Sequence, residues 1–199
     1  MYAFTRIRVR FLGDEKMTVK EIILAAAGEL GLQEKVQAYL DGASENGKTE
    51  TEKLLQCFQL VENELALDYL PLYAEEEIET LSGAVYYSEF SKRVVRILRV
   101  MDENGNALAF KLFPAFLKTQ GGKITVAYTY APSEKSLDGE SDYILQASVR
   151  LFAYGIATEY SLAIGAFDDA AVWDKKYKDA IAAAYRSRPS RKMRARRWA

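Results

Sequence analysis

The order of two sequence patterns constrains the fold of this 199-residue chain more than any single motif does. Residues 84–132 are rich in β-branched and aromatic side chains, whereas the stretches on either side repeat apolar residues at helical intervals. A β-patterned stretch inserted between two helical stretches requires the helical stretches to pack together. We therefore expect an α+β fold, in which N- and C-terminal helices form a bundle and an antiparallel β domain projects from it.

The helical stretch before the insertion contains two capping-box sequences. In Thr18–Glu21, a Thr hydroxyl and a Glu carboxylate have the spacing that satisfies two free backbone amides, which predicts a helix over residues 18–30. Thr49–Glu52 repeats this spacing and predicts the longest helix, over residues 50–69. Pro71 should stop that helix, because proline lacks the amide hydrogen that a helix interior needs.

The β-patterned stretch predicts about four antiparallel strands. Residues 102–106 have the sequence Asp-Glu-Asn-Gly-Asn, a strong hairpin-turn signal, and residues 119–122 predict a second turn. Between residues 123 and 130, large apolar and small polar side chains alternate with the period of a strand. Pro114 marks an edge or a bend, since proline cannot donate to a sheet ladder.

After Pro132 the pattern returns to helix, first over residues 142–164 and then over 167–185. The expected organisation is an N-terminal strand or arm (1–17), the first part of the helical bundle (18–80), the antiparallel β domain (84–132), the second part of the bundle (140–185) and an extended basic C-terminal arm (186–199).

In the N-terminal segment, basic and apolar residues alternate. Arg6, Arg8 and Arg10 alternate with apolar residues, which is the pattern of a half-buried strand with three arginines on one face. Such a strand suits a sheet edge or an arm. The sequence assigns no role to the three arginines.

The C-terminal arm differs sharply in charge from the rest of the chain. It holds seven of the 27 Lys and Arg residues and none of the 28 Asp and Glu residues, so residues 1–185 carry 20 basic against 28 acidic groups. The arm has too little apolar content to become ordered alone, so it should receive its structure from a partner. The alternative is a solvated tail without function. The expected docking residues are Arg186, Arg188, Arg191, Lys192, Arg194, Arg196, Arg197 and Trp198.

The absence of histidine excludes more functions than any motif suggests. Without imidazole there is no Ser-His or Cys-His pair and no ordinary zinc site, so we expect no catalytic residues, no metal and no cofactor. The lone Cys57 lies among apolar residues and is read as a buried small hydrophobe. The acidic clusters at Asp14-Glu15, Glu75–Glu77 and Asp168-Asp169 are each explained by a loop, a helix start or a solvated face. A carboxylate-dependent enzyme is left without a supporting motif.

The hydropathy of the chain predicts no membrane association. No run of 18 apolar residues occurs, and the N-terminus lacks the apolar stretch of a signal peptide. We therefore expect neither membrane insertion nor secretion, and synthesis in the cytoplasm.

Thirteen tyrosines are a high number, and tyrosine is enriched on half-wet contact surfaces. Tyr86, Tyr87, Tyr128 and Tyr130 are candidates for a contact face of the β domain. They are equally well explained as ordinary strand residues that cover a small core. Base stacking on this face would also need a basic surface, whereas residues 1–185 are acidic overall.

Several stretches together resemble the head-to-tail adaptor (connector or neck) proteins of tailed bacteriophages. The stretches that carry the resemblance are Asn63–Ala66 before Tyr69–Pro71, Lys123–Pro132, the acidic turn Leu137–Glu140, the alanine-rich helix after it, Trp173–Ala180 and the ending Arg191–Trp198. The resemblance spans most of the chain and rests on a pattern of segments.

The resemblance implies a virion structural protein that forms a ring, often of twelve copies, between the portal protein and downstream tail or neck proteins. In that family the bundle contacts the portal, the β domain faces the tail, the arm inserts into the outer surface of the portal, and DNA passes through the ring without sequence-specific recognition. The protein would be made in the bacterial host cytoplasm and end at the portal vertex of the virion. The alternative is a nucleic-acid-binding module that uses the basic C-terminal arm.

Overall fold

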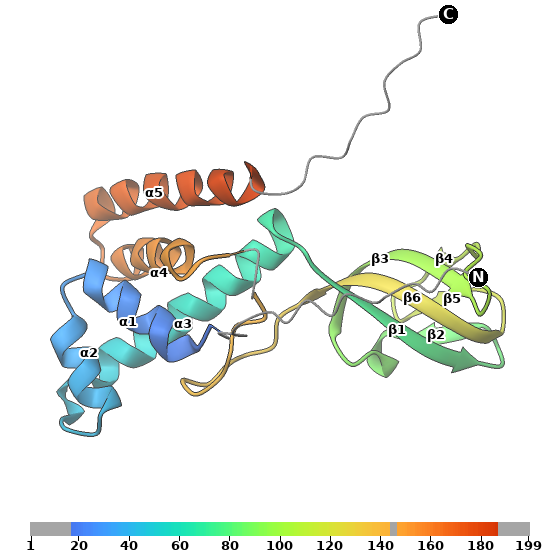
Figure 1. Ribbon diagram of the computed structural model, residues 1–199, viewed down its shortest axis with the longest axis horizontal. Helices are drawn as coiled ribbons and strands as arrows, with labels where there is room; N and C mark the ends of the chain where they lie inside the picture. The colour runs from blue at the N-terminus through green and yellow to red at the C-terminus, as the bar shows by residue number, and fades with distance from the viewer. Residues whose placement is uncertain (1–16, 144–146, 187–199) are drawn as a thin grey trace, which may run out of the picture.

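The structure is a computed structural model that describes residues 17–143 and 147–186, and it has two parts arranged along one long axis (Figure 1). Helices form a bundle at one end, and antiparallel strands form a β domain at the other. The α+β class is thus the one expected, with the β domain inserted between two sets of helices.

The described residues contain five α-helices, six strands and three short helical turns. In chain order these are α1 (Val19–Glu29), α2 (Gln33–Leu40), a 3₁₀ turn (Glu45–Gly47), α3 (Lys48–Glu64), a π-helical turn (Leu65–Tyr69), β1 (Leu72–Thr80), β2 (Ala84–Tyr86), a 3₁₀ turn (Tyr87–Glu89), β3 (Arg93–Asp102), β4 (Lys111–Leu112), β5 (Phe116–Lys118), β6 (Gly122–Ala131), α4 (Val149–Ala163) and α5 (Phe167–Arg186).

The two predicted capping boxes have different outcomes. The first is confirmed: the backbone N–H of Glu21 donates to Thr18 Oγ1 at 3.3 Å, and the backbone N–H of Thr18 donates to Glu21 Oε2 at 3.0 Å. The second does not form, because α3 starts at Lys48 with Gly47 as its N-cap. A side chain at Gly47 would place its Cβ 2.1 Å from the carbonyl oxygen of Lys35, so close packing against α2 fixes the start of α3.

The assignment of residues 18–80 to the first part of the bundle is wrong in its last nine residues, which form β1. Three consecutive glutamates obscured this strand, because glutamate is uncommon in strands. Alternate burial along the strand leaves Glu75 and Glu77 exposed and Glu76 half-buried. The cluster Glu75–Glu77 therefore lies on a strand, and the β domain begins at Leu72.

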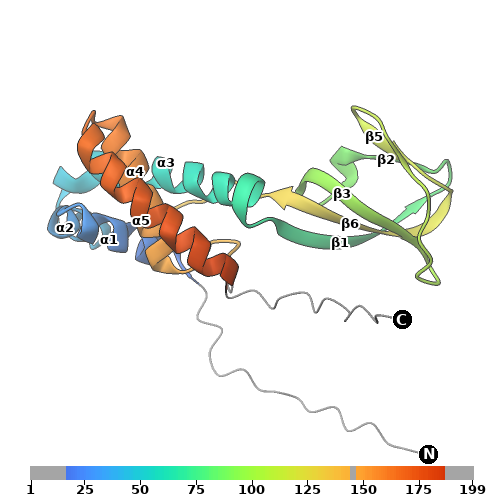
Figure 2. The same cartoon turned by 90° about the horizontal axis from the view of Figure 1, so that it is seen from above.

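The β domain consists of two three-stranded antiparallel sheets, with strand orders β1-β6-β3 and β2-β5-β4 (Figure 2). The predicted turn at residues 102–106 forms, and the side chain of Asp102 accepts from the backbone N–H of Asn106 at 2.8 Å. It does not close a long hairpin, because β3 pairs with β6 whereas β4 pairs with β5. Pro114 lies in the short turn between β4 and β5.

Strand β3 contains two bulges that change its periodicity. Its register against β6 skips Val95 and Leu98, so each lies opposite no residue of the partner strand. As a result Ile97 and Val100, three residues apart, both point into the core, while both bulged side chains are exposed. The same spacing leaves the arginines at positions 93, 96 and 99 exposed.

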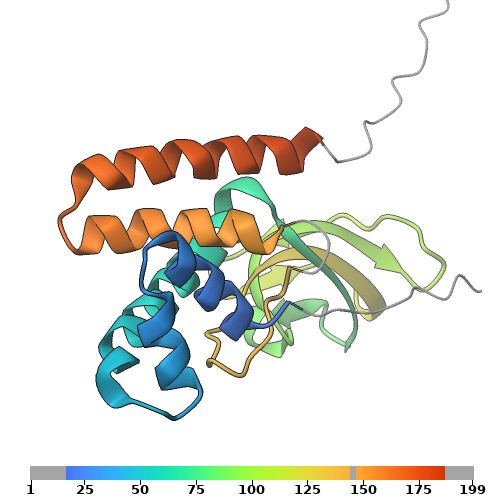
Figure 3. The ribbon, with the colours of Figure 1, turned by 60° about the vertical axis from the view of Figure 1, so that its left-hand side comes forward.

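In the bundle, α4 lies between α5 on one side and α1 with α3 on the other (Figure 3). The helices approach closely at Gly155 of α4. A Cβ built there would lie 2.7 Å from Cγ1 of Val61 in α3 and 2.9 Å from Cε2 of Tyr177 in α5. The absence of a side chain at this position therefore permits α4 to sit between its two neighbours.

The chain returning from the β domain is held against α3 by a buried carboxylate. Glu62 is 1% exposed, and its Oε1 accepts from Ser141 Oγ at 2.7 Å and from the backbone N–H of Asp142 at 3.1 Å. Next to it, Lys135 and Asp142 form an ion pair of 3.2 Å. These bonds join α3 to a segment some 80 residues later.

The helix predicted to start at residue 142 starts later. Asp142 and Tyr143 are not helical, and α4 begins at Val149, where Ser148 Oγ accepts from the backbone N–H of Leu151 at 3.2 Å. The preceding residues are held instead by Glu62 and by the hydroxyl of Tyr143, which donates to the carbonyl of Leu70 at 2.7 Å. Tertiary hydrogen bonds thus hold Asp142 and Tyr143 outside the predicted helix.

Gly155→Ala should lower the free energy of unfolding by about 1–3 kcal/mol, because the added methyl group overpacks the contact among α3, α4 and α5. Gly28→Ala is the matched control, since the nearest atom to its added Cβ lies at 3.6 Å and alanine favours helix by up to about 1 kcal/mol. Urea unfolding of both variants checks this. Equal effects of the two substitutions would contradict the packing described at Gly155.

Glu62→Gln should become more stable relative to the native chain as the pH rises from 5 to 8. Burial raises the pKa of Glu62 above its ordinary value of 4.5, although hydrogen bonds from Ser141 and Asp142 oppose this. Between the unfolded and folded pKa values the native state keeps a proton that the unfolded chain has lost, so stability falls as the pH rises through that window. Gln keeps the accepting oxygen but does not ionise.

Urea unfolding at several pH values measures this difference. Glu62→Ala is the control, because it leaves the donors of Ser141 and Asp142 unpaired and should destabilise the protein at every pH, by about 1–3 kcal/mol per buried donor. A stability difference between Glu62→Gln and the native chain that does not change with pH would show that Glu62 ionises as it does in the unfolded chain.

Candidate interaction surfaces

A groove of about 670 Å³ lies between the first half of α4 and the second half of α5. Its walls include the small side chains of Ala147, Ala180 and Ala183, and its polar groups include Arg150, Lys176 and Asp179. Tyr154, which is buried, forms part of its floor. The volume lies within the range of about 300–1,000 Å³ that binding pockets commonly have.

Cations and aromatic rings contact one another at this groove and beside it: Arg150, Tyr154 and Lys176 line the groove, and Trp173 adjoins them. The Arg150 side chain donates from Nε to Tyr154 Oη at 2.6 Å, and the Tyr154 ring stacks on Trp173 with centroids 5.9 Å apart. Lys176 Nζ lies 4.0 Å from the centre of the Trp173 ring. Each such contact at an exposed site contributes about 0.5–1 kcal/mol, which is enough to orient the two cations at the groove. We call this set, Arg150, Tyr154, Trp173 and Lys176, the cation–aromatic cluster.

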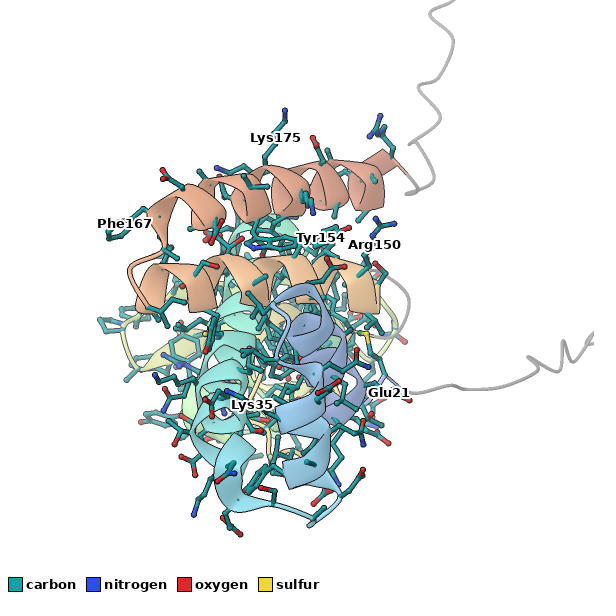
Figure 4. All side chains as sticks on the ribbon, turned by 90° about the vertical axis from the view of Figure 1, so that its left-hand side faces the viewer. Glu21, Lys35, Arg150, Tyr154, Phe167 and Lys175 are labelled. Carbon is teal, nitrogen blue, oxygen red and sulfur yellow. The ribbon has the colours of Figure 1, made fainter. Side chains whose placement is uncertain are left out.

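The other end of the α4–α5 pair presents exposed apolar side chains. Ile164 is 54% exposed, Phe167 is 69% exposed and Val172 is 56% exposed. The acidic side chains of Asp168 and Asp169 lie beside them and are also exposed. We call these five residues the helical tip. Figure 4 shows Phe167 at one end of the α4–α5 pair and Arg150 at the other, so the helical tip and the groove lie toward opposite ends of the pair.

A second apolar surface lies on the sheet β2-β5-β4, whose strands are shorter than those of the sheet β1-β6-β3. The rings of Phe113 and Phe116 are stacked with centroids 4.7 Å apart, and Tyr86 lies 5.6 Å from Phe116. Tyr86 is 50% exposed, and Leu112 beside this group is also exposed. Because large apolar side chains gathered on a surface commonly mark contact sites, this aromatic group is a candidate contact surface of the β domain.

The four tyrosines predicted as a contact face do not form one. Tyr128 is fully buried in the core of the β domain, where its hydroxyl donates to Glu76. Burial, together with this hydrogen bond, raises the pKa of Tyr128 to about 12, so the phenol stays protonated as a structural donor. Tyr130 is half-buried under Lys92, and Tyr87 is half-buried as well. Among the four, Tyr86 lies on the aromatic group described above.

The exposed face of the sheet β1-β6-β3 carries both acidic and basic side chains. Arg99 on β3 and Glu75 on β1 form an ion pair of 3.1 Å across the central strand, and Lys123 pairs with Glu77 at 2.8 Å. All four side chains are about half exposed, so these pairs contribute little to stability. Because the acidic residues occupy β1, this face does not offer the uniform positive potential that a phosphate backbone requires.

Most of the predicted docking arm lies outside the described residues. Arg186 is the last residue of α5 and is exposed. Arg188, Arg191, Lys192, Arg194, Arg196, Arg197 and Trp198 lie beyond the described residues, as do Arg6, Arg8 and Arg10. The prediction that these residues dock to a partner is therefore untested by the structure.

The described residues offer no arrangement for catalysis at Cys57 or for a metal at acidic clusters. Cys57 is buried, and burial raises the pKa of its thiol to about 11, which disfavours the nucleophilic thiolate. Within residues 17–143 and 147–186, no group of three or more Cys, Asp or Glu side chains could hold a metal ion. None of the helices in these ranges combines the length and apolarity needed to cross a bilayer.

A scan of the sequence against models of protein families found no match, and a search of curated proteins found none either.

Sequence reasoning missed both the groove and the helical tip. Arg150 and Tyr154 are four residues apart, and Trp173 and Lys176 are three residues apart. Either spacing places the two side chains of a pair on one helix face. These spacings are local signals, but nothing in the sequence indicates that this face of α4 packs against this face of α5. For Phe167, its position at a helix start, two residues after Gly165, was the available signal of exposure.

Proposed function

We propose that this protein is a virion structural protein, a head-to-tail adaptor that forms a ring between the portal and the tail of a tailed bacteriophage. The observation that carries the proposal is the separation of contact surfaces along an elongated molecule. Exposed apolar side chains lie on the bundle, at Leu60 and Leu67 as well as at Phe167, and again on the sheet β2-β5-β4, around Phe116. A protein that joins two different assemblies needs two such surfaces.

The position of α5 supports the docking role of the arm. Helix α5 packs on α4 and ends with exposed Arg186, so the sequence that continues from it starts at the surface of the bundle. That sequence contains six further Lys or Arg residues and Trp198. Arginine and tryptophan are frequent anchors of protein interfaces, and we assign the portal protein as the partner of this arm.

The remaining partners follow from the same proposal. The bundle contacts the portal, the β domain faces downstream tail or neck proteins, and about twelve copies close into the ring. DNA passes through the ring without sequence-specific recognition. The net acidity of residues 1–185 supports a molecule that stays monomeric or weakly associated in the host cytoplasm until the portal gathers its copies.

A nucleic-acid-binding module that uses the C-terminal arm is the second candidate, favoured by seven basic residues without an acidic one. The two candidates differ in salt dependence. Neutralising about seven phosphates would give a slope of roughly −6 when the logarithm of the affinity for duplex DNA is plotted against the logarithm of the salt concentration. Docking into a protein surface depends instead on shape and on Trp198.

Deletion of residues 187–199 should abolish attachment to phage heads that carry the portal but lack this protein. The deletion leaves α5 whole and removes no described core residue, so circular dichroism and the melting temperature should stay unchanged. Co-sedimentation with such heads measures attachment. Full-length levels of attachment by the truncated chain would refute the docking role of the arm, and loss of folding would place the arm in the core.

Trp198→Ala should weaken that attachment by about 2 kcal/mol or more, because a Trp that fills a pocket of the partner is a typical hot spot. Met193→Ala is the matched control, since it removes an apolar side chain from the same arm without changing its charge. Titration of labelled protein against portal-bearing heads gives both affinities. A loss of less than about 0.5 kcal/mol for Trp198→Ala would mean that the arm acts through charge alone.

A further inference from the structure

The helical tip and the groove are complementary in polarity. The helical tip presents three apolar side chains, of which Phe167 is the most exposed. The groove offers an aromatic floor at Tyr154 and alanine walls that leave room for an inserted side chain. An exposed phenylalanine that enters such a groove would remove apolar surface from water on both sides, at about 25 cal/mol per Å².

The charges of the two surfaces are also complementary. Asp168 and Asp169 lie beside the apolar side chains of the helical tip, while Arg150 and Lys176 lie at the groove. The groove contains one carboxylate, Asp179, and its described charges therefore sum to a positive value. Complementary charge of this kind selects the orientation and the partner of a contact more than it adds affinity.

The two surfaces lie at opposite sides of the same helix pair, so a molecule cannot bring its own helical tip to its own groove (Figure 4). We propose that the helical tip of one copy docks in the groove of the next copy, with Phe167 inserted over Tyr154 and the two aspartates facing Arg150 and Lys176. This contact joins two different surfaces, and its repetition closes into a ring or continues as a filament. The inference deepens the proposed adaptor function and rests on it for the closure of the ring.

The charges of the β domain are compatible with the same arrangement of neighbouring copies, in which the helical-tip side of one copy meets the groove side of the next. In Figure 2, β3 lies on the side of the molecule where α5 begins, and β1 lies on the side where α5 ends. The strand on the same side of the molecule as the helical tip thus carries exposed Arg93 and Arg96, and the strand on the same side as the groove carries exposed Glu77 and Glu79. A second copy related by rotation about an axis parallel to the long axis would bring acidic and basic surfaces together in both parts of the molecule.

Other occupants fit the groove less well. The C-terminal arm of this chain is strongly basic, so Arg150 and Lys176 would repel it. An acidic segment of another protein has the required charge, but the helical tip combines that charge with exposed apolar side chains on this same chain. A second copy is therefore the occupant that we assign.

Disulfide trapping on the full chain tests the contact. In a Cys57→Ala background, Ala163→Cys places a thiol beside the helical tip and Ala183→Cys places one in the groove wall. Under mild oxidation the chain with both substitutions should form a ladder of covalent multimers on a denaturing gel. Each single variant alone should remain monomeric, whereas the mixture of the two single variants should give dimers only.

Two outcomes would overturn the inference. Dimers from Ala163→Cys alone or from Ala183→Cys alone would show a contact between identical surfaces. The absence of any ladder from the doubly substituted chain at high concentration would show that the helical tip and the groove do not meet, whether or not another protein binds the groove.

Charge exchange adds a second measurement. In the trapping chain, Asp168→Lys with Asp169→Lys, or Arg150→Glu with Lys176→Glu, should reduce the ladder about tenfold or more, because each places like charges face to face. Mixing the two exchanged chains should restore it, since each then meets a complementary surface. If the mixture of the two exchanged chains does not form the ladder again, the proposed pairing of these charges is contradicted.

The same chains separate this inference from the adaptor function. If the ladder and its charge rescue are observed but the native chain does not attach to portal-bearing heads, the contact between copies stands and the adaptor function is refuted. If the native chain attaches to heads and no ladder forms, the adaptor function stands and this contact is refuted.

Discussion

The buried carboxylate of Glu62 is the interaction on which the two-part architecture depends. It lies in α3, before the β domain, and accepts hydrogen bonds from Ser141 and Asp142, which follow the β domain. An inserted domain leaves its parent fold through one strand and must return through another, and the return is specified only if the second segment recognises the first. Because Glu62 is sequestered from water, losing either donor would leave an uncompensated polar group, and the return path is therefore tightly defined. From this fixed point the chain starts α4, which then occupies the space that Gly155 leaves between α3 and α5.

Local signals in the sequence predicted local structure well, and contacts between distant segments account for the errors. The capping box at Thr18 and Glu21 is complete within four residues, so its hydrogen bonds could be predicted. Strand β1 was missed because the glutamates that hide it are compensated by residues far along the chain, such as Arg99 and Lys123. For Tyr128 the sequence left a contact face and a core position equally open, and the hydrogen bond from its hydroxyl to Glu76 on the neighbouring strand is what allows the ring to lie in the core.

The candidate surfaces illustrate the same limit. Arg150 and Tyr154 share a helix face, as do Trp173 and Lys176, and each pair is visible in the sequence. The cation–aromatic cluster exists only because α4 and α5 pack with those faces together, and that packing is set by Gly155 and Tyr177. The basic C-terminal arm, by contrast, is a property of composition, and the sequence alone describes it.

The two bulges of β3 have a consequence for the behaviour of many copies held close together. A regular edge strand offers an uninterrupted row of backbone amides and carbonyls, on which a strand of another molecule can add and begin an aggregate. The extra residues Val95 and Leu98 interrupt that row twice between Val94 and Arg99. When copies are crowded at high local concentration, addition of a strand at the β3 edge is therefore disfavoured, and contacts at that edge are left to side chains, which can be made and broken reversibly.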